Sequence, residues 1–126
     1  MKIFSYNVRG LGCRLTWRKI RTLLCSEDVD MVFIQETKLK VMEKTIWSAL
    51  WGGSEFEWLE LPVNNSAGGL LCIWRKEGFV LTVSFNGMGY MGFIGKWKEV
   101  DQNIIVVNIY APCKTRDKKS LWDALL

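Results

Sequence analysis

The sequence contains no histidine. This absence excludes Ser-His-Asp triads, Cys-His dyads, HExxH zinc helices and every other mechanism that uses an imidazole as acid or base. Any chemistry that these 126 residues perform alone must therefore use carboxylates, amides, tyrosines, lysines or cysteines.

Cysteines are few and scattered, and long apolar runs are missing. The four cysteines form no CxxC pair and no zinc-binding spacing: Cys13, Cys25, Cys72 and Cys113. They are too sparse to staple a small secreted domain, so we expect reduced and mostly buried thiols. No apolar run approaches the ~18 residues of a membrane span, and the first ten residues lack the apolar stretch of a signal peptide. We expect a soluble protein of the cell interior, nuclear or cytoplasmic, with no membrane partner.

The composition is that of a globular chain, with 49% hydrophobic and 24% charged residues, enough for one compact domain. The formal net charge is +4, and its distribution is uneven. The first 26 residues contain six basic residues and no acidic one, and residues 114–119 hold a second basic cluster. These clusters favour an anionic partner, although two ordinary solvated faces would have the same composition.

Apolar periodicity predicts a mixed α/β chain. Residues 2–8 alternate as a strand, and a helical stripe runs from Thr16, placed as N-cap, to residue 24. Residues 31–34 form a continuous apolar run, which is typical of a strand buried on both faces. A second helix is predicted over residues 43–50 and the start of another over 117–126. Further strands are predicted near residues 56–61, 69–74, 79–85, 90–97 and 104–110, with turns including Asn86-Gly87 and Asp101-Gln102-Asn103.

Polar residues follow three apolar strands at their carboxyl ends. These residues are Asn7 in the first strand, Glu36 after the second, and Asn108 and Tyr110 in the last. Ligand sites collect at the carboxyl ends of central strands, and a carboxylate held there is a natural ligand for Mg²⁺. The alternative is structural, with a solvated carboxylate, turn-forming asparagines and a tyrosine of the core.

Four segments together resemble a known group of proteins. They are SYNVRGLG at residues 5–12, IQETK at 34–38, SAGGLLCIW at 66–74 and NIYAP at 108–112. Their order and spacing resemble the endonuclease/exonuclease/phosphatase superfamily, which includes apurinic endonucleases, DNase I and retrotransposon endonucleases. The sequence is most similar to the endonuclease domain of plant LINE-type (non-LTR) retrotransposons.

The resemblance implies a DNase I-like, four-layered α/β sandwich with two packed sheets, and a metal-dependent phosphodiesterase that cuts nucleic acid, most readily DNA. It implies that Asn7 lies in the active-site pocket and that Glu36 holds the catalytic Mg²⁺, for which Mn²⁺ could substitute. Tyr110 would contact the scissile phosphate, and Asn108 would line the neighbouring floor. Basic residues would hold the nucleic-acid backbone: Arg9, Arg14, Lys38, Lys114 and Arg116.

The sequence also departs from that superfamily. It lacks the later Gly-Asp-x-Asn segment, a further aspartate and the terminal Ser-Asp-His. It also has Arg9 and Cys113 where relatives often carry a small polar residue and asparagine. We therefore expect residues 1–126 to form about half of the family domain, a truncated unit with little or no activity alone. Three alternatives stay open: a non-catalytic nucleic-acid binder, a phosphatase-type member of the superfamily, and a genomic relic without a selected role.

Overall fold

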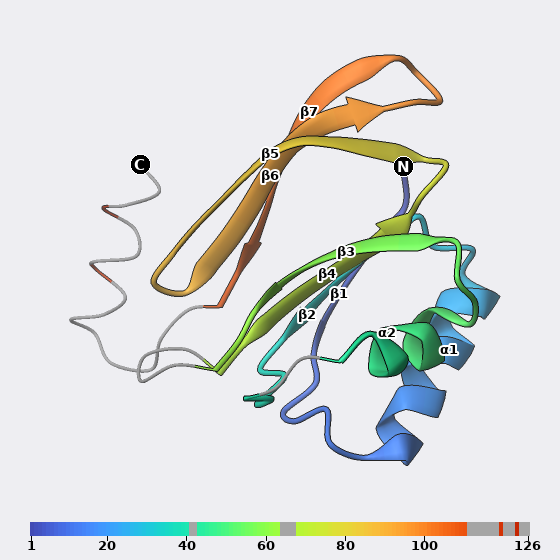
Figure 1. Cartoon of the computed structure of the whole chain (residues 1–126), viewed down its shortest axis with the longest axis vertical. Coiled ribbons are helices and arrows are strands. Elements are labelled where there is room, and N and C mark those ends of the chain that lie inside the picture. The colour runs from blue at the N-terminus through green and yellow to red at the C-terminus, as the bar shows by residue number, and fades with distance from the viewer. Residues whose placement is uncertain (41–42, 64–67, 111–118, 120–122, 124–126) are drawn as a thin grey trace.

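The computed structural model describes residues 1–40, 43–63, 68–110, 119 and 123. Within this part, two helices and seven strands form two separate β-sheets, with both helices beside the first sheet (Figure 1). This arrangement confirms the predicted α/β class. The elements are β1 (Ile3–Asn7), α1 (Arg14–Ser26), β2 (Met31–Gln35), α2 (Lys44–Trp51), β3 (Phe56–Leu61), β4 (Leu70–Arg75), β5 (Phe79–Gly87), β6 (Tyr90–Trp97) and β7 (Gln102–Ile109).

The first sheet has the strand order β1-β2-β4-β3. Strands β1 and β2 are parallel, and α1 is the crossover that joins them. Every residue of β2 is buried, as the apolar run predicted. Its side chains alternate between two cores, because Val32 and Ile34 pack with the helices while Met31 and Phe33 pack with the second sheet.

The second sheet is an antiparallel meander with the order β5-β6-β7. Aromatic rings fill the space between the sheets. Phe93 is fully buried, and its ring centroid lies 5.1 Å from that of Trp74 and 5.4 Å from that of Phe79. Helices, first sheet and second sheet are thus three layers. The expected fourth layer is not found within the described residues, where the predicted last helix is represented only by helical Lys119 and Asp123.

Three predicted boundaries are wrong. Helix α1 begins at Arg14 with Cys13 as N-cap, so Thr16 lies inside the helix; the exposed Leu15 of the first turn lies off the apolar stripe that the prediction followed. The β5–β6 turn is Met88-Gly89 rather than Asn86-Gly87, because the left-handed φ of +80° lies at Gly89 and the ladder continues to that point. The next turn covers residues 98–101, and Gln102 and Asn103 pair in β7.

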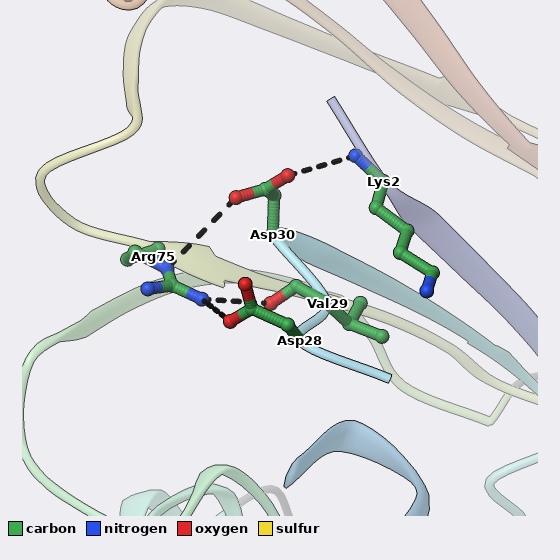
Figure 2. Close-up of polar contacts among 5 residues, drawn as sticks. All are labelled: Lys2, Asp28, Val29, Asp30 and Arg75. Carbon is green, nitrogen blue, oxygen red and sulfur yellow. Dashed lines mark hydrogen bonds and ion pairs between the residues drawn. The ribbon is translucent and has the colours of Figure 1, made fainter. Parts of the chain in front are cut away.

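Polar contacts fasten the amino-terminal end of the first sheet, where β1 and β2 begin (Figure 2). The Lys2 backbone N–H donates to an Asp30 carboxylate oxygen at 2.8 Å, and Arg75 Nη2 donates to Asp28 at 3.2 Å and to the Val29 carbonyl at 3.3 Å. These contacts tie the start of β2 to β1 and to the end of β4. No helix in the described part of the chain is long and apolar enough to cross a membrane.

Candidate functional site

The structure brings together the three strand ends that the sequence singled out. Asn7 and Gln35 are register partners at the carboxyl ends of β1 and β2, and the Val8 N–H donates to the Gln35 carbonyl at 3.1 Å. Strand β7 reaches the same place from the second sheet, because Gln35 Nε2 donates to Asn108 Oδ1 at 2.8 Å. One edge of the molecule therefore carries polar residues from both sheets.

Glu36 is half-buried and lies one residue beyond the end of β2. Its carbonyl accepts a 2.8 Å hydrogen bond from the Gly10 N–H, so the loop after β1 holds its backbone from one side. Gly68 holds it from the other, since a Cβ at that position would lie 3.3 Å from both Cα and Cγ of Glu36. The carboxylate is thus carried by a backbone fixed on two sides.

The backbone around Glu36 adopts unfavourable angles. Arg9, Glu36 and Lys38 have φ of +53°, +55° and +55°, which places three non-glycine residues in the left-handed region within two adjoining loops. Each such residue costs about 1–2 kcal/mol, and the surrounding hydrogen bonds must hold it. The Lys38 N–H donates to the Gly68 carbonyl at 2.6 Å. Clustered strain of this kind is typical of functional sites.

Asn7 is exposed at the end of β1, and its Oδ1 accepts a 3.2 Å hydrogen bond from the Arg9 N–H. This local turn orients the amide and leaves its NH₂ group without a hydrogen-bond partner among the described residues. Asn7 can therefore donate to a ligand at the strand end. Its role as a pocket residue stays a prediction.

Asn108 is 1% exposed, which makes it a buried link between the sheets. Its Nδ2 donates to the carbonyls of Ile34 at 3.4 Å and Leu71 at 3.2 Å, while its Oδ1 accepts from Gln35. A side chain with these partners holds Gln35, the residue before Glu36, in place, and it has little exposed surface for contact with a ligand. That it lines the floor of a pocket stays a prediction.

Sequence reasoning missed two buried polar residues beside the site. Gln35, 8% exposed, donates through Nε2 to Ser5 Oγ at 2.9 Å as well as to Asn108. Thr37 is fully buried, and its Oγ1 has no hydrogen-bond partner among the described residues. The available signal was their position, since polar residues directly at the end of a fully apolar strand need partners inside the protein.

Tyr110 follows β7 directly, half-buried against the core between the sheets. Its backbone N–H donates to the Gly89 carbonyl at 2.7 Å, which fixes the chain where it leaves the second sheet. It lies two residues beyond Asn108 and thus near the edge where the strand ends meet. Contact with a scissile phosphate stays a prediction.

The predicted nucleic-acid contacts divide into two groups. Arg9 and Lys38 are exposed in the two loops that hold Glu36, and the Lys38 stem passes within 3.9 Å of where a Cβ of Gly10 would be. Arg14 is exposed at the first residue of α1. Lys114 and Arg116 lie outside the described residues.

Glu36 offers one carboxylate at this edge of the sheet. No group of three or more histidine, cysteine, aspartate or glutamate side chains comes together within the described ranges. Among these residues Glu36 makes no ion pair, and the exposed Asn7 is the register partner of Gln35, the residue before it. Such a donor set fits Mg²⁺, which keeps most of its water and binds through one or two carboxylates plus phosphate. It does not fit a cation that needs a full set of protein ligands.

The described thiols differ in environment, and the expectation of mostly buried thiols is wrong for Cys13 and Cys25, which are exposed. Backbone N–H groups of Leu15 and Thr16 lower the pKa of Cys13, with Lys19 adding a smaller effect. Burial raises the pKa of Cys72 to about 12.

These pKa shifts predict the order of thiol alkylation in the native protein. A lower pKa increases the thiolate fraction at neutral pH, so Cys13 should react first with iodoacetamide, and Cys72 should stay unmodified until the protein unfolds. Peptide mass spectrometry after a short pulse at pH 7 measures both. Native labelling of Cys72 as fast as that of Cys25 would contradict the structure.

Two packed sheets, helices on the outer side of the first, and polar loops at one shared end define a DNase I-like fold. Solved structures with this fold match the chain. AP endonuclease LMAP from Leishmania major has a TM-score of 0.63 at 20% identity, covering 86% of this chain and 39% of that one. The APE2 catalytic domain of Xenopus laevis has a TM-score of 0.58 at 16% identity, covering 95% and 48%. TDP2 from C. elegans has a TM-score of 0.60 at 13% identity, covering 98% and 40%.

In sequence, the chain is similar to the exodeoxyribonuclease of Streptococcus pneumoniae, which is 27% identical over 148 aligned residues in each of two strains. The alignment covers 98% of this chain and 54% of the relative, so the chain spans about half the length of the curated relatives that it matches. No protein-family model matches the sequence. The solved structures confirm the predicted resemblance in fold to AP endonucleases. The similarity to plant LINE-type endonucleases stays a prediction.

Proposed function

We propose that this chain is the metal- and phosphate-binding part of a phosphodiesterase that acts on nucleic acid, a member of the endonuclease/exonuclease/phosphatase superfamily. One observation carries the proposal: Glu36 is held in a strained loop where the strand ends of both sheets meet. The likeness to an exodeoxyribonuclease and to AP endonuclease folds supports DNA as the substrate class. The amino-acid sequences of the SYNVRGLG and SAGGLLCIW segments support descent from plant LINE-type endonucleases.

The proposed roles follow from position. Glu36 would hold Mg²⁺, or Mn²⁺ in its place, and the bound ion would polarise the phosphate and offset charge on the leaving oxygen. Asn7 would donate its free NH₂ group to a phosphate oxygen, and Tyr110 would contact the scissile phosphate. Arg9 and Lys38 would neutralise the flanking backbone charge.

We do not propose that these 126 residues cleave nucleic acid by themselves. Without histidine, and without the superfamily's later aspartates, no side chain is assigned to activate the attacking water. Acid–base catalysis alone contributes about 10²–10⁴-fold to a rate. We propose that the polypeptide binds metal and phosphate at the site and lacks this part of the catalytic machinery.

The metal site is tested by Mn²⁺ titration of the isotope-labelled protein. Paramagnetic broadening of amide signals should concentrate at residues 7–10, 36–38 and 68–69, and Glu36→Ala should abolish it. The matched control is Glu57→Ala, which removes an exposed carboxylate from β3 and should leave the broadening unchanged. Broadening spread evenly over surface acids, or unchanged in Glu36→Ala, would contradict the proposed metal site.

Cleavage is tested with supercoiled plasmid in Mg²⁺ or Mn²⁺. The purified chain should nick the plasmid no faster than buffer does. Nicking that Glu36→Ala abolishes would overturn the assignment of an incomplete catalytic site, while it would still support the metal-binding role of Glu36.

A further inference from the structure

Helix α1 carries the whole net charge of the chain. Its thirteen residues include Arg14, Arg18, Lys19 and Arg21 and no acidic residue. The formal charge of the chain is +4, and without these four residues the remaining thirteen basic and thirteen acidic residues balance. The four positive charges of this surface helix thus equal the net charge of the whole sequence.

These charges are arranged against the stability of the helix itself. The first turn contains Arg14 and no acidic residue, and the last turn contains no basic residue, so the helix lacks the terminal charges that its dipole favours. Arg14, Arg18 and Arg21 are spaced i, i+4 and i+7, so neighbouring guanidinium groups repel one another along one side. All three are exposed and make no ion pair with any residue in the described part of the chain. For Arg14 and Arg18, which have no ion pair among the described residues, such charges point to a use outside the fold.

The arginines line a groove beside α2. A cavity of about 320 Å³ is bounded by Arg14, Trp17, Arg18, Arg21 and Ala49, with no acidic residue among them. The Trp17 indole is fixed by a 2.6 Å hydrogen bond from Nε1 to the Leu11 carbonyl. The Arg21 guanidinium lies against Gly52 at the carboxyl end of α2, since a Cβ there would be 3.0 Å from Nε. The groove thus has a rigid aromatic wall and an oriented cation.

On the other side of α1, a second cavity of about 400 Å³ is lined by Tyr6, Arg18, Lys19, Thr22 and Leu23. Arg18 belongs to both cavities, so it stands on the ridge between them. An anionic polymer on this helix would meet cations on either side of that ridge.

The spacing suits the phosphates of a nucleic-acid strand. Seven residues of α-helix rise about 10.5 Å, and one strand of a duplex carries a phosphate about every 3.4 Å along its axis. That length covers about three phosphate steps, so each of the three guanidinium groups can reach a different phosphate. Trp17 adds an aromatic ring of the kind on which bases stack in positively charged grooves.

The ridge also continues from the candidate site. The Leu11 N–H donates to the Thr37 carbonyl at 2.9 Å, and Arg14 begins the helix three residues after Leu11. We infer that the α1 ridge, Arg14, Arg18 and Arg21 with Trp17, is a second nucleic-acid contact surface that binds the phosphate backbone of a strand leaving the Glu36 edge. The identity of the polymer rests on the proposed function, whereas the ridge rests on the charges and the groove.

The test measures binding of a short fluorescent DNA duplex by anisotropy across a salt series. Arg18→Gln/Arg21→Gln should weaken binding about ten-fold at low salt and reduce the slope of log K against log salt by about 1.8, since each lost phosphate contact removes about 0.9. Arg18→Lys/Arg21→Lys should keep the slope. The matched control is Lys76→Gln/Lys98→Gln, which removes two exposed charges away from α1. Equal losses in the control pair, or none in the α1 pair, would overturn the inference.

Two further measurements separate this inference from neighbouring ones. Polyglutamate of matched charge should bind much more weakly than the duplex, and equal binding would overturn nucleic acid as the partner. Mn²⁺ broadening at Glu36 should be unchanged in Arg18→Gln/Arg21→Gln. If Arg18→Gln/Arg21→Gln binds DNA as tightly as the parent while Mn²⁺ broadening at Glu36 is present, the α1 ridge is wrong and the metal site stands. If the pair weakens DNA binding while the parent shows no Mn²⁺ broadening at Glu36, the metal site is wrong and the ridge stands. Thermal melts should show a melting temperature of the glutamine pair close to that of the parent, because relief of the repulsion along α1 is opposed by loss of the Arg21 cation at the carboxyl end of α2.

Discussion

Replacing Asn108 by aspartate should destabilise the protein by about 3–5 kcal/mol, a large part of the 5–15 kcal/mol of a typical domain. The substitution exchanges a buried NH₂ donor for a carboxylate oxygen that faces the carbonyls of Ile34 and Leu71. A buried charge without a donor partner is among the most costly changes a core can receive. Urea denaturation followed by tryptophan fluorescence measures the loss.

The Asn108→Asp deficit should also depend on pH in a definite direction. Burial raises the pKa of the new carboxyl in the folded state above its unfolded value of about 3.9. The folded state then binds more protons, so the deficit relative to the parent grows as pH rises above about 4. The control is Asn103→Asp, at an exposed position of the same strand, which should stay within about 0.5 kcal/mol. A loss below about 1 kcal/mol for Asn108→Asp would contradict the buried link between the sheets.

Gly69→Ala should cost about 3 kcal/mol and displace the loop that holds Glu36. Gly69 has a φ of +95°, which L side chains rarely adopt, and a Cβ there would collide with the buried Oγ1 of Thr37. The Thr37 N–H also donates to the Gly69 carbonyl at 3.3 Å, so the strain is passed directly to the residue after Glu36. Mn²⁺ broadening at residues 36–38 should weaken together with stability.

A double-mutant cycle separates the two causes of the Gly69→Ala loss. In a Thr37→Ala background the colliding oxygen is gone, so the penalty of Gly69→Ala should fall to the part due to its φ, about 1–2 kcal/mol. Gly53→Ala is the control, since its position is open and has no left-handed φ. It should be neutral or slightly stabilising. Equal penalties in both backgrounds would show that Thr37 does not crowd this position.

Much of the fold could be predicted because its signals are local. The apolar run at residues 31–34 indicated a strand buried on both faces, and β2 is buried at every position. Errors occurred where local signals compete, as at Asn86-Gly87, whose composition favours a turn although Gly87 pairs with Tyr90 in the ladder. Pairing with β6 decided where β5 ends, and the sequence of β5 alone does not indicate that pairing.

The sequence predicted which residues stand at the candidate site, but it did not predict how deeply each side chain is buried. Asn7, Glu36 and Asn108 all stand at strand ends, as their positions after apolar runs indicated. Nothing in those runs distinguishes an exposed Asn7 from an Asn108 that is 1% exposed. Both β1 and β7 are edge strands, so edge position does not explain the difference. It arises because the Asn108 side chain faces the first sheet, where it accepts from Gln35 and donates to the Ile34 and Leu71 carbonyls. Burial depends on which sheet covers which face, a relation between distant segments.

The sequence by itself determined the absence of imidazole chemistry, the α/β class, the polar strand ends and the acid-free basic stretch, because each depends only on composition or short-range periodicity. The tertiary structure alone decided that the strand ends of two sheets meet. It also decided that Arg9, Glu36 and Lys38 share a strained pair of loops and that three arginines of α1 line one groove. Such relations depend on strand register, sheet packing and helix rotation, which are set when separated segments bury apolar faces against each other.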